Sequence, residues 1–329
     1  MPILDNHGRP ITYVRLAVTD RCNLRCFYCM PAEGIQYVAR KELLTYEEML
    51  RLVSVLARMG ITKVRITGGE PFLRRDLIHF LKQLVEIEGI KDVHITTNGV
   101  ITGRYLEELK AMGIASMNLS LDTLDPQRFY EITRRNEFEK VWACLEKMMA
   151  LDIPTKINTV VMDGRNTEDI VPLVGLTEKY PIGVRFIEEM PFNGSGGKQG
   201  IEWNHKKILA GIKERYPNMQ KITDGPHSTS FNYQIPGFPG SFGVIPAFSR
   251  TFCGSCNRIR LTARGQLKTC LYDDGVLDMK DIVRSSNDDA VVEQAFLSAF
   301  GQRAQNGFEA EKRRQNNRPI EESMSTIGG

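Results

Sequence analysis

The sequence lacks the features that mark a membrane protein or a strongly charged one. Among its 329 residues no apolar stretch is long enough to cross a bilayer, and residues 1–10 lack the apolar core of a signal peptide. The net charge is only +3, so binding to nucleic acid or to an anionic membrane would require a local basic patch. We therefore expect a cytoplasmic protein that binds neither membranes nor nucleic acid.

A fourth cysteine is missing near the N-terminal cysteine group. Cys22, Cys26 and Cys29 lie within eight residues, and the next cysteine is Cys144. Thiols stay reduced in the cytoplasm, so clustered cysteines indicate metal ligands and not disulfides. A closed zinc site or an ordinary cubane cluster takes four protein ligands, so three thiolates indicate a metal centre with one open coordination position.

A second group of three cysteines, again without a fourth, lies near the C-terminus. Two residues separate Cys253 from Cys256, and Cys270 follows after thirteen more. Histidine, which often joins cysteine in zinc sites, is scarce: the chain has five, and none adjoins either group. Structural zinc is therefore the weaker alternative for both groups. Cys144 falls on the apolar face of a predicted helix and is expected in the core.

Between residues 13 and 190 six predicted strands alternate with helices. The predicted strands cover residues 13–19, 63–67, 93–97, 116–121, 155–161 and 183–190. This alternation indicates parallel strands joined by right-handed crossovers, in an incomplete TIM-like (β/α)6 barrel or a doubly wound sheet. We favour the α/β barrel because Arg65 and Thr67 share one strand face, as if they pointed into a lumen.

A different kind of module is predicted after the barrel. Short antiparallel strands are expected over residues 242–245, 258–262 and 265–269, followed by helices to about residue 305. We expect this extension to cover the barrel opening, and we divide the chain into a barrel, residues 1–225, and a C-terminal module, residues 226–329. By composition alone, the polar stretch from residue 302 to the end would be a floppy tail.

Two motifs together resemble the radical S-adenosylmethionine (SAM) enzymes: the CxxxCxxC loop after the first strand, and Gly68-Gly69-Glu70-Pro71 after the second. The resemblance implies a [4Fe-4S] cluster on Cys22, Cys26 and Cys29, whose fourth iron binds the amine and carboxylate of SAM. It also implies that four residues contact this cofactor. Tyr28 would pack on the adenine and Gly69 would meet the methionyl end, while Ser120 and Met190 would touch the cofactor from strand ends.

Three further features narrow the resemblance to one family within that superfamily, the GTP 3′,8-cyclases of molybdenum cofactor biosynthesis. They are the second cysteine group, the pair Arg258 and Arg260 that follows Cys256, and the terminal Gly328-Gly329. This resemblance implies a second [4Fe-4S] cluster, on Cys253, Cys256 and Cys270, whose open iron meets the guanine of GTP. It also implies that Gly328 and Gly329 enter the active site and take part in catalysis, since residues without side chains can thread a narrow channel.

A triphosphate carries roughly four negative charges, which suits a pocket lined by arginine forks. The resemblance implies the following GTP contacts: Arg15, Arg65, Thr96, Lys156, Arg258 and Arg260. By the same logic we add Arg185. For these strand cations the alternative is a salt-bridged surface position. For Gly69, Ser120 and Met190 the alternative is a role in ordinary packing.

The implied reaction begins when reduction of the first cluster cleaves SAM to methionine and a 5′-deoxyadenosyl radical. That radical removes hydrogen from C3′ of GTP, C3′ bonds to C8, and reduction gives 3′,8-cyclo-7,8-dihydro-GTP, the first step of molybdenum cofactor biosynthesis. The implied partners are an electron donor and the cyclic pyranopterin monophosphate synthase that takes the product. A monomer or a homodimer is expected.

Two other functions stay open on the sequence. One is a radical SAM maturase with an auxiliary cluster that modifies a peptide. The other is a non-catalytic zinc module that binds nucleic acid through Lys312, Arg313 and Arg314. Iron and sulfide analysis after anaerobic purification would separate them, since only the enzymes contain iron–sulfur clusters.

Overall fold

A curved sheet of twelve strands is the framework of the computed structural model, which describes residues 2–190, 201–314 and 323–328. Its centre consists of six neighbouring parallel strands: β3 (Tyr13–Ala17), β4 (Lys63–Thr67), β5 (Asp92–Thr97), β6 (Ser116–Ser120), β7 (Thr155–Val161) and β8 (Gly183–Glu188). These are the six predicted strands, in chain order. The incomplete α/β barrel is thereby confirmed.

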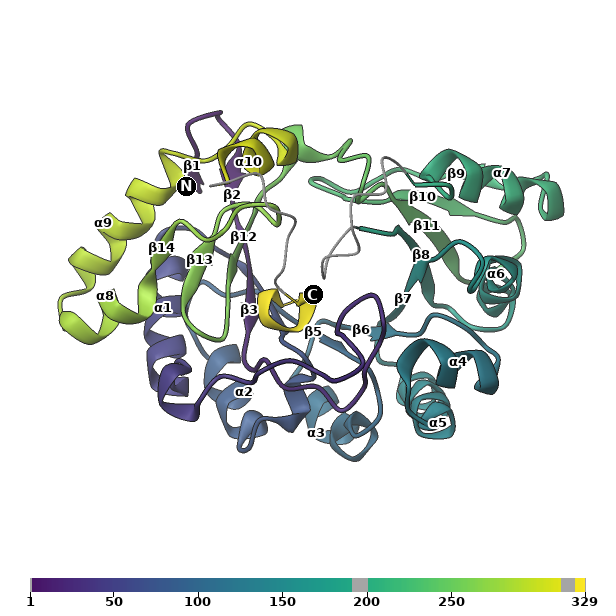
Figure 1. The fold of residues 1–329 in the computed structure, drawn as a ribbon, viewed down its shortest axis with the longest axis horizontal. Helices are drawn as coiled ribbons and strands as arrows, with labels where there is room; N and C mark the ends of the chain where they lie inside the picture. Colours follow the sequence, from purple (N-terminus) through teal and green to yellow (C-terminus); the bar gives the residue numbers. More distant parts are fainter. Residues whose placement is uncertain (1, 191–200, 315–322, 329) are drawn as a thin grey trace.

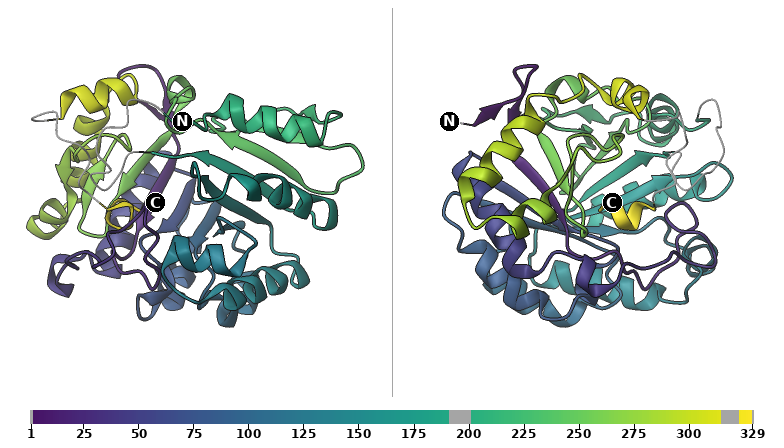
Figure 2. Two further views of the ribbon diagram at one scale, coloured as in Figure 1. Left: turned by 45° about the vertical axis from the view of Figure 1, so that its right-hand side comes forward. Right: turned by 60° about the vertical axis from the view of Figure 1, so that its left-hand side comes forward.

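Helices cover the convex face of this sheet (Figure 1; Figure 2, right). They are α1 (Tyr46–Arg58), α2 (Leu77–Val85), α3 (Leu106–Ala111), α4 (Pro126–Thr133), α5 (Phe138–Ala150) and α6 (Ile170–Lys179). A capping box starts α1: Thr45 Oγ1 accepts from the Glu48 backbone, and the Glu48 side chain accepts from the Thr45 backbone. Cys144 of α5 is buried in the apolar core, as predicted.

The C-terminal module extends the barrel sheet at both edges. Strand β11 (Ser241–Ile245) pairs in parallel with β8, and β12 (Arg258–Leu261) pairs in parallel with β3. Antiparallel strands continue outward: β10 (Phe231–Gln234) and β9 (Gln220–Lys221) beyond β11, then β13 (Gln266–Lys268) and β14 (Leu277–Asp278) beyond β12. Because β11 and β12 do not pair with each other, the barrel stays open between them.

The predicted β12–β13 hairpin is present, and its turn uses Gly265 at φ +89°. The other strand predicted beside it, β11, lies instead on the opposite edge of the sheet. The edge strands of an incomplete barrel present unpaired backbone groups, and β11 and β12 satisfy them. The antiparallel pairing of the module is therefore joined to the barrel sheet on two sides.

The remaining elements lie on the C-terminal half and at the N-terminus. The helices are α7 (His205–Arg215), α8 (Met279–Ser285), α9 (Asp289–Phe300), α10 (Gly307–Arg313) and α11 (Met324–Ile327). An N-terminal hairpin joins β1 (Ile3–Leu4) to β2 (Pro10–Ile11), and short 3-10 turns cover residues 40–42, 71–73, 102–105, 167–169 and 253–255. None of the helices within the described parts of the chain has the length and apolar character that crossing a membrane requires.

The composition-based expectation of a floppy tail is wrong for the described residues beyond 302. Asn306 caps α10 by accepting from the backbone of Phe308 and Glu309, and Ser323 caps α11 by accepting from the backbone of Ser325. Figure 1 shows α11 within the opening of the curved sheet. Polar residues are ordered there because they make these caps and the site contacts described next.

Candidate active site

The concave side of the sheet encloses a cavity of about 570 Å³. All six predicted cysteine ligands line it, as does every residue predicted to contact SAM or GTP. These residues come from both halves of the chain, because β12 brings Arg258 and Arg260 against β3. The structure thus gathers at one cavity the candidates that the sequence scatters over 250 residues and more.

The first cysteine loop follows β3 and packs tightly on the Gly-Gly turn that follows β4. The Glu70 backbone donates to the Arg21 carbonyl at 2.7 Å, and Gly69 donates to Thr19 at 2.9 Å. A Cβ atom on Gly69 would stand 2.2 Å from the Arg21 carbonyl oxygen. Only glycine permits this approach, so at least the packing role of Gly69 is certain from the geometry.

The thiols within each cysteine group lie close enough for their charges to interact. Charge on Cys29 or Cys22 would raise the pKa of Cys26, and charge on Cys256 or Cys253 would raise that of Cys270. Burial is the larger cause, and it raises the pKa of Cys22 to about 11 and of Cys270 to about 12. Such thiols stay protonated at neutral pH until a metal displaces the proton.

The donor sets fit iron–sulfur clusters better than single ions. In the parts of the chain that the structure describes, no three His, Cys, Asp or Glu side chains surround a single-ion position. In a cubane cluster each cysteine binds a different iron, so its ligands need not converge on one point. Two sets of three thiols, close together but not convergent, match that chemistry.

Cys256 differs from the other thiols. Although burial raises its pKa, the neighbouring guanidinium groups of Arg303 and Arg258 outweigh this and lower it below the ordinary value. The Arg303 guanidinium lies 3.2 Å from the Cys256 sulfur. Sequence reasoning missed Arg303, which is 47 residues away in the chain.

Cations from neighbouring strands stand side by side on the cavity wall. Strand register places Arg15 directly between Arg65 and Arg260. Burial and the nearby cations lower the pKa of Arg15, and that of Lys156 falls to about 8 and that of Arg185 to about 10. Like charges this close favour binding of an anion, which would stabilise the charged forms.

Several polar atoms on the wall have their hydrogen-bonding capacity unused. Buried Asn118 Oδ1, Asn158 Oδ1 and Arg258 Nη1 have no hydrogen-bond partner among the described residues. Buried polar groups normally have partners, so these atoms are suited to contact a ligand. The two asparagines were not predicted, although each lies two residues from a predicted site residue, Ser120 or Lys156, on the same strand face.

Of the residues predicted around SAM, Tyr28 lies within the first cysteine loop and Gly69 packs against it. The Tyr28 hydroxyl donates to Asp122 Oδ2 at 2.8 Å, and burial raises the pKa of Asp122 to about 6. Ser120 ends β6, and Met190 packs against the small apolar cluster that contains Ile327 of α11. Asp122, a further residue that sequence reasoning missed, thus fixes the aromatic ring between Cys26 and Cys29.

The described end of the chain connects the first cysteine group with the cations. Ser323 Oγ donates to the Cys29 carbonyl at 2.6 Å, and Arg260 Nη1 donates to the Gly328 carbonyl at 2.7 Å. Gly328 has φ +83°, and a Cβ there would stand 2.6 Å from Thr67 Oγ1. Gly329 lies outside the described residues.

Known families cover most of the chain. Residues 16–176 match the Radical SAM superfamily, and residues 182–309 match Molybdenum Cofactor Synthesis C. A protein of Peptoclostridium acidaminophilum named GTP 3′,8-cyclase is 40% identical over 290 residues, covering 87% of this chain and 88% of that protein. The protein of the same name from Syntrophomonas wolfei is 40% identical over 308 residues, covering 91% and 92%.

Longer relatives and solved structures also match. Molybdenum cofactor biosynthesis protein 1 of Drosophila melanogaster is 40% identical over 91% of this chain but only 53% of its own length. The chain spans about half the length of the animal relatives that it matches. The crystal structure of Streptococcus suis SuiB bound to S-adenosylmethionine has a TM-score of 0.62 at 17% identity, covering 89% of this chain and 69% of SuiB, which shows the shared fold.

Proposed function

The chain belongs to the GTP 3′,8-cyclase family of the radical SAM superfamily, and from this premise we propose that it converts GTP to 3′,8-cyclo-7,8-dihydro-GTP. The observation that carries the proposal is one cavity of about 570 Å³ lined by both three-cysteine groups and by a row of cations on neighbouring strands. One group would generate the radical, and the cations would hold the triphosphate. Family membership also argues against the zinc and nucleic-acid alternative.

The bound cofactors, a [4Fe-4S] cluster with SAM on Cys22, Cys26 and Cys29 and a second cluster on Cys253, Cys256 and Cys270, would supply the one-electron chemistry. The protein's own contribution is to hold GTP with C3′ toward the first site and guanine toward the second. Holding the reacting atoms in place can lower the barrier substantially. The cavity also shields the reacting carbon from solvent.

The proposed residue roles follow the sides of the cavity. SAM is held by Tyr28, Gly69, Ser120 and Met190. The triphosphate and sugar are held by Arg15, Arg65, Thr96, Lys156, Arg185, Arg258 and Arg260. Charge-assisted hydrogen bonds from guanidinium forks suit phosphate oxygens. Burial, and after it the neighbouring cations, lower the pKa values of Arg15 and Arg185, and a bound anion would offset both effects.

The glycine tail is proposed to act from within the same chain. Arg260 holds the Gly328 carbonyl, so the last turn of the chain meets a side chain also assigned to GTP. GTP phosphate and Gly328 would then share Arg260, which couples tail position to substrate binding. Gly329 is proposed as a catalytic residue together with Gly328, as the family resemblance implies.

The wider context is proposed from the family resemblance that the sequence carries. An electron donor must reduce the first cluster, and the product passes to the cyclic pyranopterin monophosphate synthase. The chain is proposed to work in the cytoplasm as a monomer or homodimer, although an Arabidopsis thaliana relative is named as mitochondrial. The boundary between a barrel at residues 1–225 and a module at residues 226–329 also stays a proposal.

Anaerobic incubation with GTP, SAM and dithionite tests the function. We expect 5′-deoxyadenosine together with a cyclised nucleotide, and about eight irons per chain before the reaction. Replacing Cys270 with Ala should preserve SAM cleavage while preventing the cyclised product. A peptide maturase would instead leave GTP unchanged. A purified protein that contains zinc and no iron would contradict both radical SAM functions, the cyclase and the maturase.

A further inference from the structure

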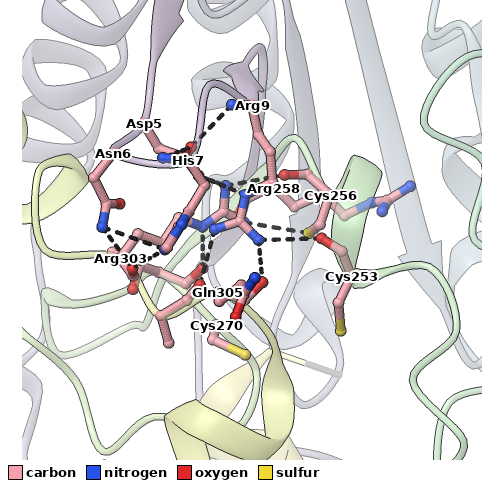
Figure 3. A network of polar contacts seen from close by, with 12 residues as sticks. Asp5, Asn6, His7, Arg9, Cys253, Cys256, Arg258, Cys270, Arg303 and Gln305 are labelled. Atoms are coloured by element: carbon pink, nitrogen blue, oxygen red, sulfur yellow. Dashed lines mark hydrogen bonds and ion pairs between the residues drawn. The ribbon is translucent and has the colours of Figure 1, made fainter.

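Arg303 contacts the second cysteine group through all three of its side-chain nitrogens (Figure 3). Nη2 lies 3.2 Å from the Cys256 sulfur and 2.8 Å from the Arg258 carbonyl oxygen. Nη1 donates to the Cys256 carbonyl at 2.9 Å, and Nε donates to the Thr269 carbonyl at 3.0 Å. Thr269 precedes Cys270, so one guanidinium holds both segments that carry the cysteines.

Asp5 of the N-terminal hairpin fixes this guanidinium. Asp5 Oδ2 lies 3.2 Å from Arg303 Nη1 and 2.7 Å from Arg9 Nε. The side chains of Asp5 and Arg303 are 0% and 3% exposed, so water screens neither charge effectively. Arg9 donates in turn to the Cys253 carbonyl at 3.1 Å. Arg303 and Arg9 thus place two buried cations on the Cys256 and Cys253 side of the group, whereas Asp273 accepts from the backbone of Cys270 at 2.8 Å.

The charged donor is directed at one sulfur of the group. Cys253 and Cys270 receive hydrogen bonds from the backbone of Gly307 and Tyr272, which are neutral donors. In the first group the side-chain donors are also neutral: Asn98 Nδ2 lies 3.7 Å from the Cys22 sulfur, and Tyr28 and Ser323 hydrogen-bond Cys26 and Cys29. A guanidinium 3.2 Å from a ligand sulfur therefore distinguishes the second site from the first.

We infer that Arg303, fixed by Asp5, is a positioning residue that holds Cys256 and raises the reduction potential of the cluster bound by the second cysteine group. The inference rests on the proposed function, because it requires that cluster. Reduction adds an electron to the cluster and increases the negative charge on its thiolate ligands. A buried cation that donates to one of these sulfurs stabilises the reduced state more than the oxidised state.

The test isolates the second cluster in the full chain. Cys26→Ala removes a ligand of the first cluster, and this variant is the parent. Arg303→Gln is added to the parent, and the two proteins are compared by iron analysis and an EPR-monitored redox titration. We expect about four irons per chain in both proteins and a more negative midpoint potential in the Arg303→Gln variant. Arg284→Gln is the matched control, since exposed Arg284 pairs with Glu48 on the same half of the protein. It should leave the potential unchanged.

Further variants keep the inference falsifiable if Arg303→Gln does not retain iron. Arg303→Lys keeps the positive charge but cannot reproduce the fork, so it should shift the potential in the same direction by a smaller amount. Asp5→Asn removes a buried negative charge while the contacts of Arg303 to Cys256 and Thr269 remain, so it should shift the potential in the opposite direction. An iron-loaded second site with the same potential in all Arg303 and Asp5 variants would overturn this inference alone. A parent protein that binds no iron at the second site would overturn the two-cluster function as well.

Discussion

Lys156 lies among cations on the cavity wall, and burial together with Arg185 and Arg65 lowers its pKa to about 8. Between this value and its ordinary pKa of 10.5, the unfolded chain keeps a proton that the folded chain has lost. The free energy of unfolding should therefore rise with pH across that window. Tyr13, whose pKa falls to about 8 because Arg65 and Arg15 outweigh burial, contributes in the same direction.

Replacing Lys156 with Met tests this charge balance. At pH 7 the variant should gain on the order of 1–2 kcal/mol in unfolding free energy, since partial exposure screens the repulsion. It should bind GTP roughly tenfold to hundredfold more weakly, because a charged hydrogen bond contributes about 1.5–3 kcal/mol. Urea unfolding at pH 7 and 9 measures the unfolding free energy, and calorimetric GTP titration measures the affinity. Lys140→Met, on the outer helix α5, is the control. Unchanged stability together with unchanged GTP affinity would remove Lys156 from the site.

Gly69 permits a second test at the level of one residue. Gly69→Ala places a Cβ 2.2 Å from the backbone oxygen of Arg21, which cannot move without displacing the first cysteine loop. We expect a loss of about 1–3 kcal/mol in stability and a fall from about eight irons per chain to about four. Gly254→Ala is the matched control, because a Cβ at Gly254, inside the second cysteine loop, would meet nothing within 4 Å. Full iron content in the Gly69 variant would contradict the close packing.

Among the elements, the barrel strands and the β12–β13 hairpin were predictable, whereas β9, β10 and β14 and the position of β11 in the sheet were not. β3 to β8 alternate with helices and carry clear apolar periodicity, so sequence alone predicts them to within a few residues. β10 is only four half-buried residues in a turn-rich segment. The position of β11 beside β8 depends on which edge offers unpaired backbone groups, a property of the assembled barrel that local sequence does not encode.

The same distinction applies to the site. The six cysteines and the strand cations stand in motifs or on alternating strand positions, so sequence and family resemblance together pointed to them. Asp5 and Arg303 escaped notice because their role depends on a contact between residues 298 positions apart. Helix α11 was not predicted for a similar reason. Its sequence is too short for intrinsic helix propensity to stabilise it, and contacts with Cys29 and Arg260 hold it in place.

Helix α11 provides a prediction at the scale of an element. Gly328→Ala adds a Cβ 2.6 Å from Thr67 Oγ1 at a backbone φ of +83°, which should push the tail away from Arg260. We expect both clusters to be retained, with cyclised product formed at least tenfold more slowly, a loss of about 1.4 kcal/mol in transition-state stabilisation. Gly113→Ala shares a positive φ of +73° but has open space around it, so it controls for backbone strain. Normal turnover of the Gly328 variant would show that the tail position is not critical.

At the scale of the whole molecule, the cavity wall joins both halves of the chain, since β12 from the C-terminal half completes the cation row on β3 and β4. An anion bound across that row should stabilise the entire fold. Inorganic tripolyphosphate at about one hundred times its dissociation constant should raise the unfolding free energy by about 2.7 kcal/mol. Guanosine, which lacks phosphate, should do much less.

Thermal unfolding in matched ionic strength measures this difference, because added salt would screen the cations by itself. The stabilisation by tripolyphosphate should shrink in Arg15→Met and Arg260→Met, which remove cations from the two halves of the row, and persist in Arg284→Gln, which lies outside the cavity. If guanosine stabilises the chain as strongly as tripolyphosphate, the cations are not the triphosphate site. If a single-stranded RNA of equal charge stabilises it more than tripolyphosphate does, the enclosed cavity is not where the anion binds. The cations stand side by side on the concave wall, with Arg15 between Arg65 and Arg260, and this close spacing favours the compact anion over the polymer.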